Sequence, residues 1–149
     1  MKFVFKFEKL LKIREFEKDK VENQLAKLQF ELNKEQQKLK DLYLMLREYN
    51  LKLENSLKGN LNINEINSVR YYLEKIDKEI DIQKKIIIQI NNEVSTKKKQ
   101  LIRAVQKVKI LEKLREKKYE SYLKKMDYIE SNVLDEIGTN QYYRKSKIC

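Results

Sequence analysis

A hydrophobic repeat with alternating spacings of three and four residues runs through almost all of the 149 residues and breaks only once, at residues 57–62. Before the break, one heptad phase is apolar at seven of eight positions, and its apolar members are Val4, Leu11, Leu25, Leu32, Leu39, Leu46 and Leu53. A weaker second phase starts at Phe7, and the pattern resumes after the break from Ile66 to Val108. Such spacing places apolar residues along one seam between paired helices. We therefore predict an all-α protein whose two long helices form an antiparallel coiled-coil hairpin.

The composition also favours long solvated helices over a globular domain. The chain has no Pro, two Gly and 38% charged residues, a profile that is poor in loop-forming residues. Its apolar residues form a stripe that can be buried only against another helix. Stability must therefore come from side-by-side helix contact.

The break and its flanking residues set the expected boundaries within this single coiled-coil domain, residues 1–149. We expect the first helix at about 4–57, the turn at about 58–63, the second helix at about 64–137 and a frayed tail at 138–149. Gly59-Asn60 would end the first helix with a left-handed residue, and Gly138 would end the second helix. Asn62 would cap the second helix, with Glu65 completing a pair similar to a capping box.

A turn near residue 60 pairs residue i with a residue near 120 − i, so the first helix is used up when the second reaches about residue 116. Some twenty further helical residues, roughly 30 Å at 1.5 Å per residue, extend beyond it. They continue the apolar stripe with Tyr119, Tyr122, Met126, Ile129, Val133 and Ile137. Because an exposed apolar stripe is unfavourable in water, this end either frays or is covered by another protein, and we expect the second.

The charge is strongly and unevenly basic. The net charge is +11, and residues 95–125 hold twelve Lys or Arg against three Glu. Such a stretch attracts phosphate backbones, anionic lipid or acidic protein surfaces. The alternative interpretation is a solvated coiled-coil flank, or a Lys-rich composition inherited from the source genome.

Two features favour the cytoplasm. The N-terminus lacks the continuous apolar core of a signal peptide, and no apolar stretch is long enough to span a bilayer. The one cysteine, Cys149, excludes an internal disulfide and fits a reducing compartment.

The residues that most catalytic sites need are scarce. There is no His, which removes the usual general base and most zinc sites. Two isolated glycines cannot form a phosphate-binding loop. The aromatic residues are spread over the whole length rather than gathered as a base-stacking platform. We therefore expect a chain that is not an enzyme, holds no cofactor or metal and binds no specific nucleic acid.

Three segments of the chain carry a family resemblance. The opening is Phe3-x-Phe5-x-Phe7-x-x-Leu10-Leu11-x-x-Arg14-Glu15, residues 111–117 read Leu-Glu-Lys-Leu-Arg-Glu-Lys, and residues 134–137 read Leu-Asp-Glu-Ile. In order and spacing they resemble segments of the flagellar FliJ proteins of the bacterial type III export apparatus. The resemblance covers essentially the whole chain, including its length and its single central turn.

The resemblance implies a non-enzymatic component of flagellar protein export, similar in fold to the central stalk of rotary ATPases. Its open end would enter the hexameric export ATPase, and the hairpin would contact the cytoplasmic part of the export gate, a membrane protein. The resemblance also implies contact with export chaperones and a cytoplasmic position, peripheral to the inner face of the cell membrane at the flagellar base. Such a protein would serve flagellum assembly and motility.

The family's gate-binding stripe can be carried over position by position. It falls on Lys38, Leu42, Met45, Tyr49, Tyr72, Ile76, Glu79 and Gln83. The expected gate-binding residues are Leu42, Tyr49, Tyr72 and Ile76, which keep the family's apolar or aromatic character, whereas Lys38, Met45 and Glu79 depart from it. The pairing rule independently places those four at one level of the hairpin. Leu42, Tyr49 and Ile76 also occupy the weaker seam phase and are alternatively core residues, whereas Tyr72 lies off both phases and should be partly exposed.

The expected ATPase-binding residues lie at the open end, where the unpaired stripe meets the basic stretch. They are Phe3, Phe7, Leu11, Arg14, Arg115, Tyr122, Met126, Ile129 and Val133. The basic members would meet acidic groups that line the ATPase ring, and salt would weaken this attraction.

Two other interpretations stay open. A stalk homologue from an injectisome or a rotary ATPase would share this architecture, although a rotary-type stalk is normally longer and carries a globular insertion. A generic basic coiled-coil tether would dimerise, bind a partner helix or bind nucleic acid.

Overall fold

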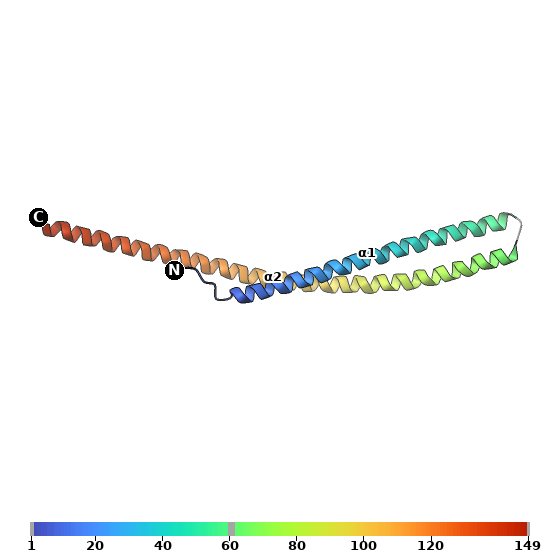
Figure 1. The fold of residues 1–149 in the computed structure, drawn as a ribbon, viewed down its shortest axis with the longest axis horizontal. Coiled ribbons are helices and arrows are strands. Elements are labelled where there is room, and N and C mark those ends of the chain that lie inside the picture. The colour runs from blue at the N-terminus through green and yellow to red at the C-terminus, as the bar shows by residue number, and fades with distance from the viewer. Residues whose placement is uncertain (1, 60–61, 149) are drawn as a thin grey trace. The chain divides into compact units, whose positions relative to one another are not determined.

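The fold consists of two long helices. The computed structural model describes residues 2–59 and 62–148, with side chains up to residue 145. Helix α1 spans Glu8–Lys58 and helix α2 spans Ile63–Ile148 (Figure 1). The described residues contain no strand. The predicted all-α coiled-coil hairpin of two long helices is therefore confirmed.

Packing divides the chain into two compact units. The turn unit is residues 19–102, and it holds most of α1 and the N-terminal part of α2. The terminal unit is residues 1–18 together with residues 103–149, and it holds the start of α1 and the rest of α2. Each unit carries its own candidate surface.

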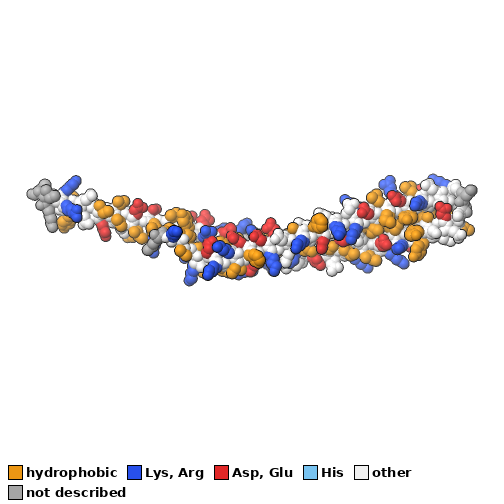
Figure 2. Space-filling view, viewed as in Figure 1, with side chains coloured by type: hydrophobic (Ala, Val, Ile, Leu, Met, Phe, Trp, Pro, Cys, Tyr) orange, Lys and Arg blue, Asp and Glu red, His pale blue; other side chains and the backbone are white. Residues whose placement is uncertain are grey.

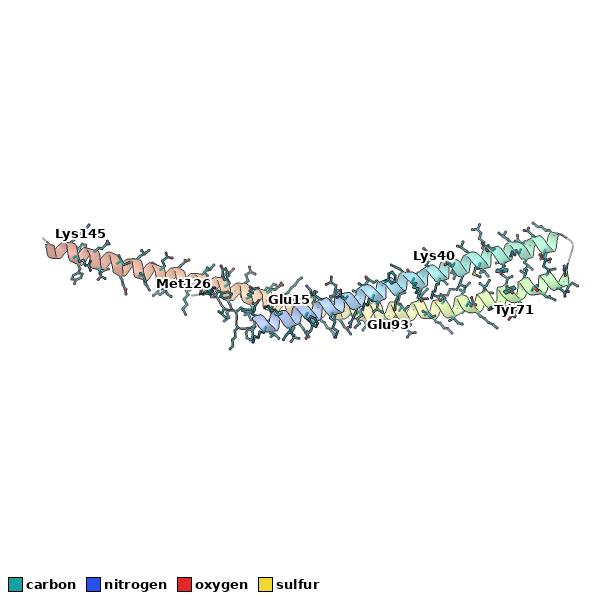
Figure 3. All side chains as sticks on the ribbon, viewed as in Figure 1. Glu15, Lys40, Tyr71, Glu93, Met126 and Lys145 are labelled. Atoms are coloured by element: carbon teal, nitrogen blue, oxygen red, sulfur yellow. The ribbon has the colours of Figure 1, made fainter. Side chains whose placement is uncertain are left out.

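The seam of the turn unit follows the predicted heptads. On α2 its buried side chains are Val69, Ile76, Ile80, Gln83, Ile87 and Val94. On α1, Leu25 is buried, and the later leucines of the stronger phase are half-buried. Fully burying one aliphatic side chain contributes about 1.5–3 kcal/mol, so this seam is the main source of stability. Figure 3 shows side chains between the helices and others that point to solvent from their outer faces.

Three contacts across the turn unit fix the antiparallel register. Glu35 meets Gln83, Tyr49 meets Tyr72, and Gln24 meets Lys97. The residue numbers of each pair add up to about 120, as the position of the turn predicted. The contact of Lys97 is a hydrogen bond, in which its Nζ donates to Gln24 Oε1 at 2.8 Å.

Of the predictions for the turn, the cap at the start of α2 is confirmed and the left-handed residue at the end of α1 is not. Asn62 caps α2 as expected, because the backbone N–H of Asn64 donates to Asn62 Oδ1 at 3.1 Å. The expected left-handed conformation of Gly59 is wrong, because no described residue has a positive φ. Asn60, the other expected left-handed residue, lies outside the described residues.

The N-terminal segment differs from the expected helix. Helix α1 begins at Glu8 rather than near residue 4, and residues 2–5 have no regular structure. Val4, expected in the seam, is 82% exposed, whereas Phe5 is buried. An extended segment turns alternate side chains to opposite sides, so this form buries the aromatic surface of Phe5 and Phe3, where a helix would have buried Val4. The backbone N–H of Glu8 then donates to the carbonyl of Phe5 at 3.2 Å, where the helix starts.

Helix α2 is longer than expected. It continues through Gly138 to Ile148, so the predicted end near residue 137 is wrong. An isolated glycine destabilises a helix by about 1 kcal/mol relative to alanine. This cost is too small to end the helix by itself. Beside it, the Thr139 hydroxyl donates to the carbonyl of Asp135 at 2.9 Å, a contact made within a continuing helix.

Candidate partner-binding surfaces

The turn unit carries a tyrosine cluster that joins both helices. The rings of Tyr49 and Tyr72 stack with centroids 5.5 Å apart and an interplanar angle of 21°. The rings of Tyr71 and Tyr72 pack in a T-shaped arrangement with centroids 5.9 Å apart. Lys52 Nζ lies 5.0 Å from the centroid of the Tyr49 ring. Stacked and edge-on rings with a nearby ammonium group form a favourable amphipathic surface.

The four expected gate-binding residues differ in exposure. Tyr72 is 46% exposed, which agrees with its position off both seam phases. Leu42 and Tyr49 are half-buried, so each is partly accessible to solvent. Ile76 is only 4% exposed and belongs to the core. In the folded hairpin Ile76 therefore supports the surface from beneath and offers almost no contact area of its own.

A shallow groove of about 360 Å³ brings together five of the eight positions of the carried-over stripe. These are Lys38, Leu42, Met45, Glu79 and Gln83, with Asp41 and Ile82 completing the lining. Met45 and Ile82 are exposed apolar residues, whereas Lys38, Asp41 and Glu79 supply charges of both signs. The groove is therefore amphipathic, as a site for a partner segment needs to be.

A polar layer interrupts the seam beside this groove. Gln83 is a buried polar residue, and its Nε2 donates to the backbone carbonyl of Glu35 at 2.9 Å and also to the Glu35 carboxylate. The hydrogen bond from Gln83 lowers the pKa of Glu35, and Lys38, whose Nζ lies 3.3 Å from Glu35 Oε1, lowers it further. This pairing was not predicted from the sequence. Its signal was the polar residue Glu35 in the weaker phase and Gln83 at seam spacing between Ile80 and Ile87.

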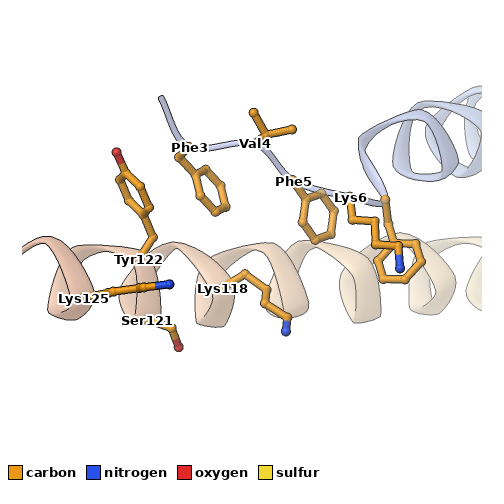
Figure 4. A pocket seen from close by; sticks show the side chains of 9 residues that line it. Phe3, Val4, Phe5, Lys6, Lys118, Ser121, Tyr122 and Lys125 are labelled. Carbon is orange, nitrogen blue, oxygen red and sulfur yellow. The ribbon is translucent and has the colours of Figure 1, made fainter. Parts of the chain in front are cut away.

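The terminal unit carries an aromatic cluster formed by the N-terminal segment and α2. The ring of Phe3 lies 5.2 Å from that of Tyr119 and 5.5 Å from that of Tyr122. Figure 4 shows the rings of Phe3 and Phe5 pointing toward α2 while Val4 points away from it. The segment therefore docks on the stripe that the sequence left without a partner.

A groove of about 500 Å³ runs along this docked segment. Its apolar lining is Phe3, Val4, Phe5, Phe7 and Tyr122, and its polar lining is Lys6, Lys118, Ser121 and Lys125. The three lysines give the rim a positive charge, so the groove suits a segment that is apolar on one side and acidic on the other.

Several expected ATPase-binding residues already have partners within the terminal unit. Leu11 is buried, Arg14 forms an ion pair of 3.0 Å with Glu17, and Arg115 Nε lies 3.6 Å from Glu8 Oε2. These side chains stabilise the start of α1 in the free chain. They are therefore less available to a partner than unpaired side chains would be.

The remaining expected residues are more accessible, and two of them belong to an exposed stripe on α2. Phe7 is partly exposed, Met126 is half-buried, and Ile129 and Val133 are 44% and 48% exposed. Figure 2 shows hydrophobic side chains among the charged ones along the C-terminal part of α2. This exposed apolar stripe on α2 is defined here as Ile129, Val133 and Ile137.

The part of the chain that the structure describes gives no sign of a metal site. Within residues 2–59 and 62–148, no group of three or more His, Cys, Asp or Glu could hold a metal ion. None of the described helices is long and apolar enough to cross a membrane.

Comparison with known proteins gives two matches to one family. The family model described as Flagellar FliJ protein matches residues 1–147. A protein of Bacillus subtilis (strain 168), named Flagellar FliJ protein, is 26% identical over 145 residues, which cover 95% of this chain and 97% of that protein. No solved structure matches the chain significantly.

Proposed function

The chain belongs to the flagellar FliJ protein family, and from this premise we propose that it is a non-enzymatic stalk of the flagellar export apparatus. Its terminal unit binds the hexameric export ATPase and stimulates ATP hydrolysis by that enzyme. Its turn unit binds the cytoplasmic part of the export gate. The family membership supports the role in flagellar export, and the two surfaces support the division of labour.

The observation that carries the ATPase contact is the exposed apolar stripe on α2. Ile129, Val133 and Ile137 are each nearly half exposed along one face of a continuous helix. Exposed apolar residues in such an array mark an interaction site. Insertion of this helix into a protein ring would bury the array without any change of fold.

The charge of the terminal unit supports the same contact. The rim lysines Lys6, Lys118 and Lys125 lie beside the docked N-terminal segment. Acidic groups of an ATPase ring would attract them and speed association, and each exposed pair would contribute at most about 1 kcal/mol. Binding should therefore weaken as the salt concentration rises.

The gate contact rests on Tyr72 and the groove lined by Leu42 and Met45. A half-exposed tyrosine held by stacking on Tyr49 is a ring of fixed position. Rigid aromatic side chains supply much of the energy of protein interfaces. Contact with the gate would hold the protein at the inner face of the membrane at the flagellar base. Export chaperones would contact the protein there.

Truncation tests the ATPase contact directly. The flagellar export ATPase of the same organism should hydrolyse ATP faster with the full chain, and the chain alone should hydrolyse none. Ending the chain after Lys118 removes the exposed stripe together with Tyr119 and Tyr122, and it should abolish most of the stimulation. If the shortened chain still folds as a helical hairpin and stimulates fully, the stripe is not the ATPase-binding surface.

A further inference from the structure

A ladder of basic residues follows the outer face of α2 in the terminal unit. Its positions are spaced by three or four residues, and they are Arg103, Gln106, Ile110, Lys113, Lys117, Ser121, Lys124 and Tyr128. Residues with this spacing share one face of a helix. All eight side chains are exposed, and none of them is Asp or Glu. We name this surface the basic ladder.

The positive charge of the basic ladder is not neutralised by ion pairs. Arg103, Lys113, Lys117 and Lys124 make no ion pair with any residue that the structure describes. Arg115, in the same stretch, does pair with Glu8. Residues 103–128 hold nine Lys or Arg against four Asp or Glu, so the stretch stays positive after its acidic residues are counted.

Two large exposed side chains lie within the same row as the cations. Ile110 is 65% exposed and Tyr128 is 68% exposed. A face that only had to remain solvated would gain nothing from an isoleucine in this position. A cationic helix face with exposed apolar and tyrosine side chains is typical of helices that lie on a membrane surface.

We propose that the basic ladder binds the anionic headgroup layer of a phospholipid membrane, with Ile110 and Tyr128 entering the interface. Residues 103–128 of α2 contain no Pro or Gly that would kink the helix. They span roughly 38 Å at 1.5 Å per residue. Each Lys or Arg held near an anionic surface strengthens binding roughly fivefold, so four would act together. The phosphates of duplex nucleic acid would also attract the cations, but they would not bury the apolar side chain of Ile110.

The cations of the basic ladder are not the residues proposed to bind the ATPase, although Ser121 also lines the groove along the docked N-terminal segment. Lys124 is two residues from Tyr122 and from Met126, and residues two apart on a helix do not share a face. Tyr122 and Met126 are half-buried, whereas Lys124 is exposed. Insertion of α2 into a ring would nevertheless cover Lys124 and Tyr128, so we expect the membrane and the ATPase to compete for this end of the basic ladder.

Vesicle flotation of the full chain tests the proposal. Vesicles of phosphatidylcholine mixed with phosphatidylglycerol should carry the protein to the top of a density gradient, and vesicles of phosphatidylcholine alone should not. The variant Arg103→Gln/Lys113→Gln/Lys117→Gln/Lys124→Gln should bind the anionic vesicles at least tenfold more weakly. Its matched control, Lys9→Gln/Lys20→Gln/Lys34→Gln/Lys40→Gln, has the same net charge and alters exposed lysines of α1, and it should bind almost as well as the natural chain.

A second substitution distinguishes a membrane from other anionic partners. Ile110→Ser should weaken binding to the anionic vesicles severalfold and leave binding to duplex DNA unchanged. Equal losses in the two quadruple variants would show that only net charge matters and would overturn the proposal. So would equal binding to both kinds of vesicle, or an Ile110→Ser variant that binds anionic vesicles as well as the natural chain does. Circular dichroism checks that each variant keeps its helices.

Discussion

The rings of Tyr49 on α1 and Tyr72 on α2 stack across the two helices with centroids 5.5 Å apart. Tyr49 is half-buried in the seam, whereas Tyr72 is 46% exposed. The seam residue therefore holds the exposed ring in a fixed orientation. This relationship separates the residues that build the hairpin from those that can meet a partner.

Substitution of Tyr72 should affect gate binding more than folding. Tyr72→Ala should weaken binding to the cytoplasmic part of the gate by about 1–3 kcal/mol, because aromatic anchors dominate interfaces. It should cost about 0.5–1.5 kcal/mol of unfolding free energy, the value of one aromatic pair. Isothermal calorimetry and thermal unfolding measure the two quantities.

Ile76→Ala is the matched core variant. It should cost about 2–5 kcal/mol of unfolding free energy as a buried truncation, with gate affinity per folded molecule almost unchanged. If Tyr72→Ala destabilised the hairpin as much as Ile76→Ala and left affinity intact, Tyr72 would be a core residue and the gate surface would lie elsewhere.

The polar layer should make stability depend on pH. Hydrogen bonding by Gln83 lowers the pKa of Glu35 below its ordinary value of 4.5. A group with a lowered folded-state pKa contributes stability that is fully present above the unfolded pKa and is lost as the pH falls through the folded pKa. The natural chain should therefore melt at a higher temperature than Glu35→Gln at pH 7, and the difference should shrink as the pH falls below about 4.5.

Thermal unfolding of both proteins across that pH range checks this expectation. A difference that stayed constant from neutral to acidic pH would mean that the Glu35 charge does not take part. The variant Glu31→Gln, altered at an exposed carboxylate one turn away, serves as a control and should behave like the natural chain.

Loss of the Phe5 ring should detach the N-terminal segment from α2 without unfolding the hairpin. Phe5→Ala removes a buried ring and should cost about 1.5–3 kcal/mol of docking, whereas Val4→Ser alters a residue that is 82% exposed and should change little. Proton NMR should show the Tyr119 and Tyr122 rings losing their contact with Phe3 in Phe5→Ala alone. Retention of those contacts would show that Phe5 does not hold the segment in place.

The sequence could predict the seam because burial against one neighbouring helix leaves a period of three and four residues, and the one break fixes the register. It could not decide the form of residues 3–7, because their alternating phenylalanines fit an extended segment while Val4 and Phe7 fit the heptad. The choice depends on the surface that α2 offers beyond the start of α1. In the same way, the heptads could place Tyr72 off the seam but could not show that Ile76 is almost fully covered or that Gln83 bonds to Glu35.

The end of α2 gives a test of the other failed prediction. Gly138 lies within the helix, and an added Cβ would meet nothing within 4 Å. Gly138→Ala should therefore stabilise this part of α2 by about 0.5–1 kcal/mol, seen as slower amide hydrogen exchange around residue 138. Faster exchange would mean that the helix ends at Gly138, as the sequence had indicated.

The rate of ATP hydrolysis by the export ATPase tests the proposed stalk function most directly. Ile129→Asp/Val133→Asp places two charges in the exposed apolar stripe on α2, and Ile88→Asp places a charge at an exposed isoleucine of the turn unit. The natural chain and Ile88→Asp should stimulate hydrolysis equally, and Ile129→Asp/Val133→Asp should lose most of the stimulation while keeping its helical content. Full stimulation by Ile129→Asp/Val133→Asp would contradict the proposal that this stripe binds the ATPase.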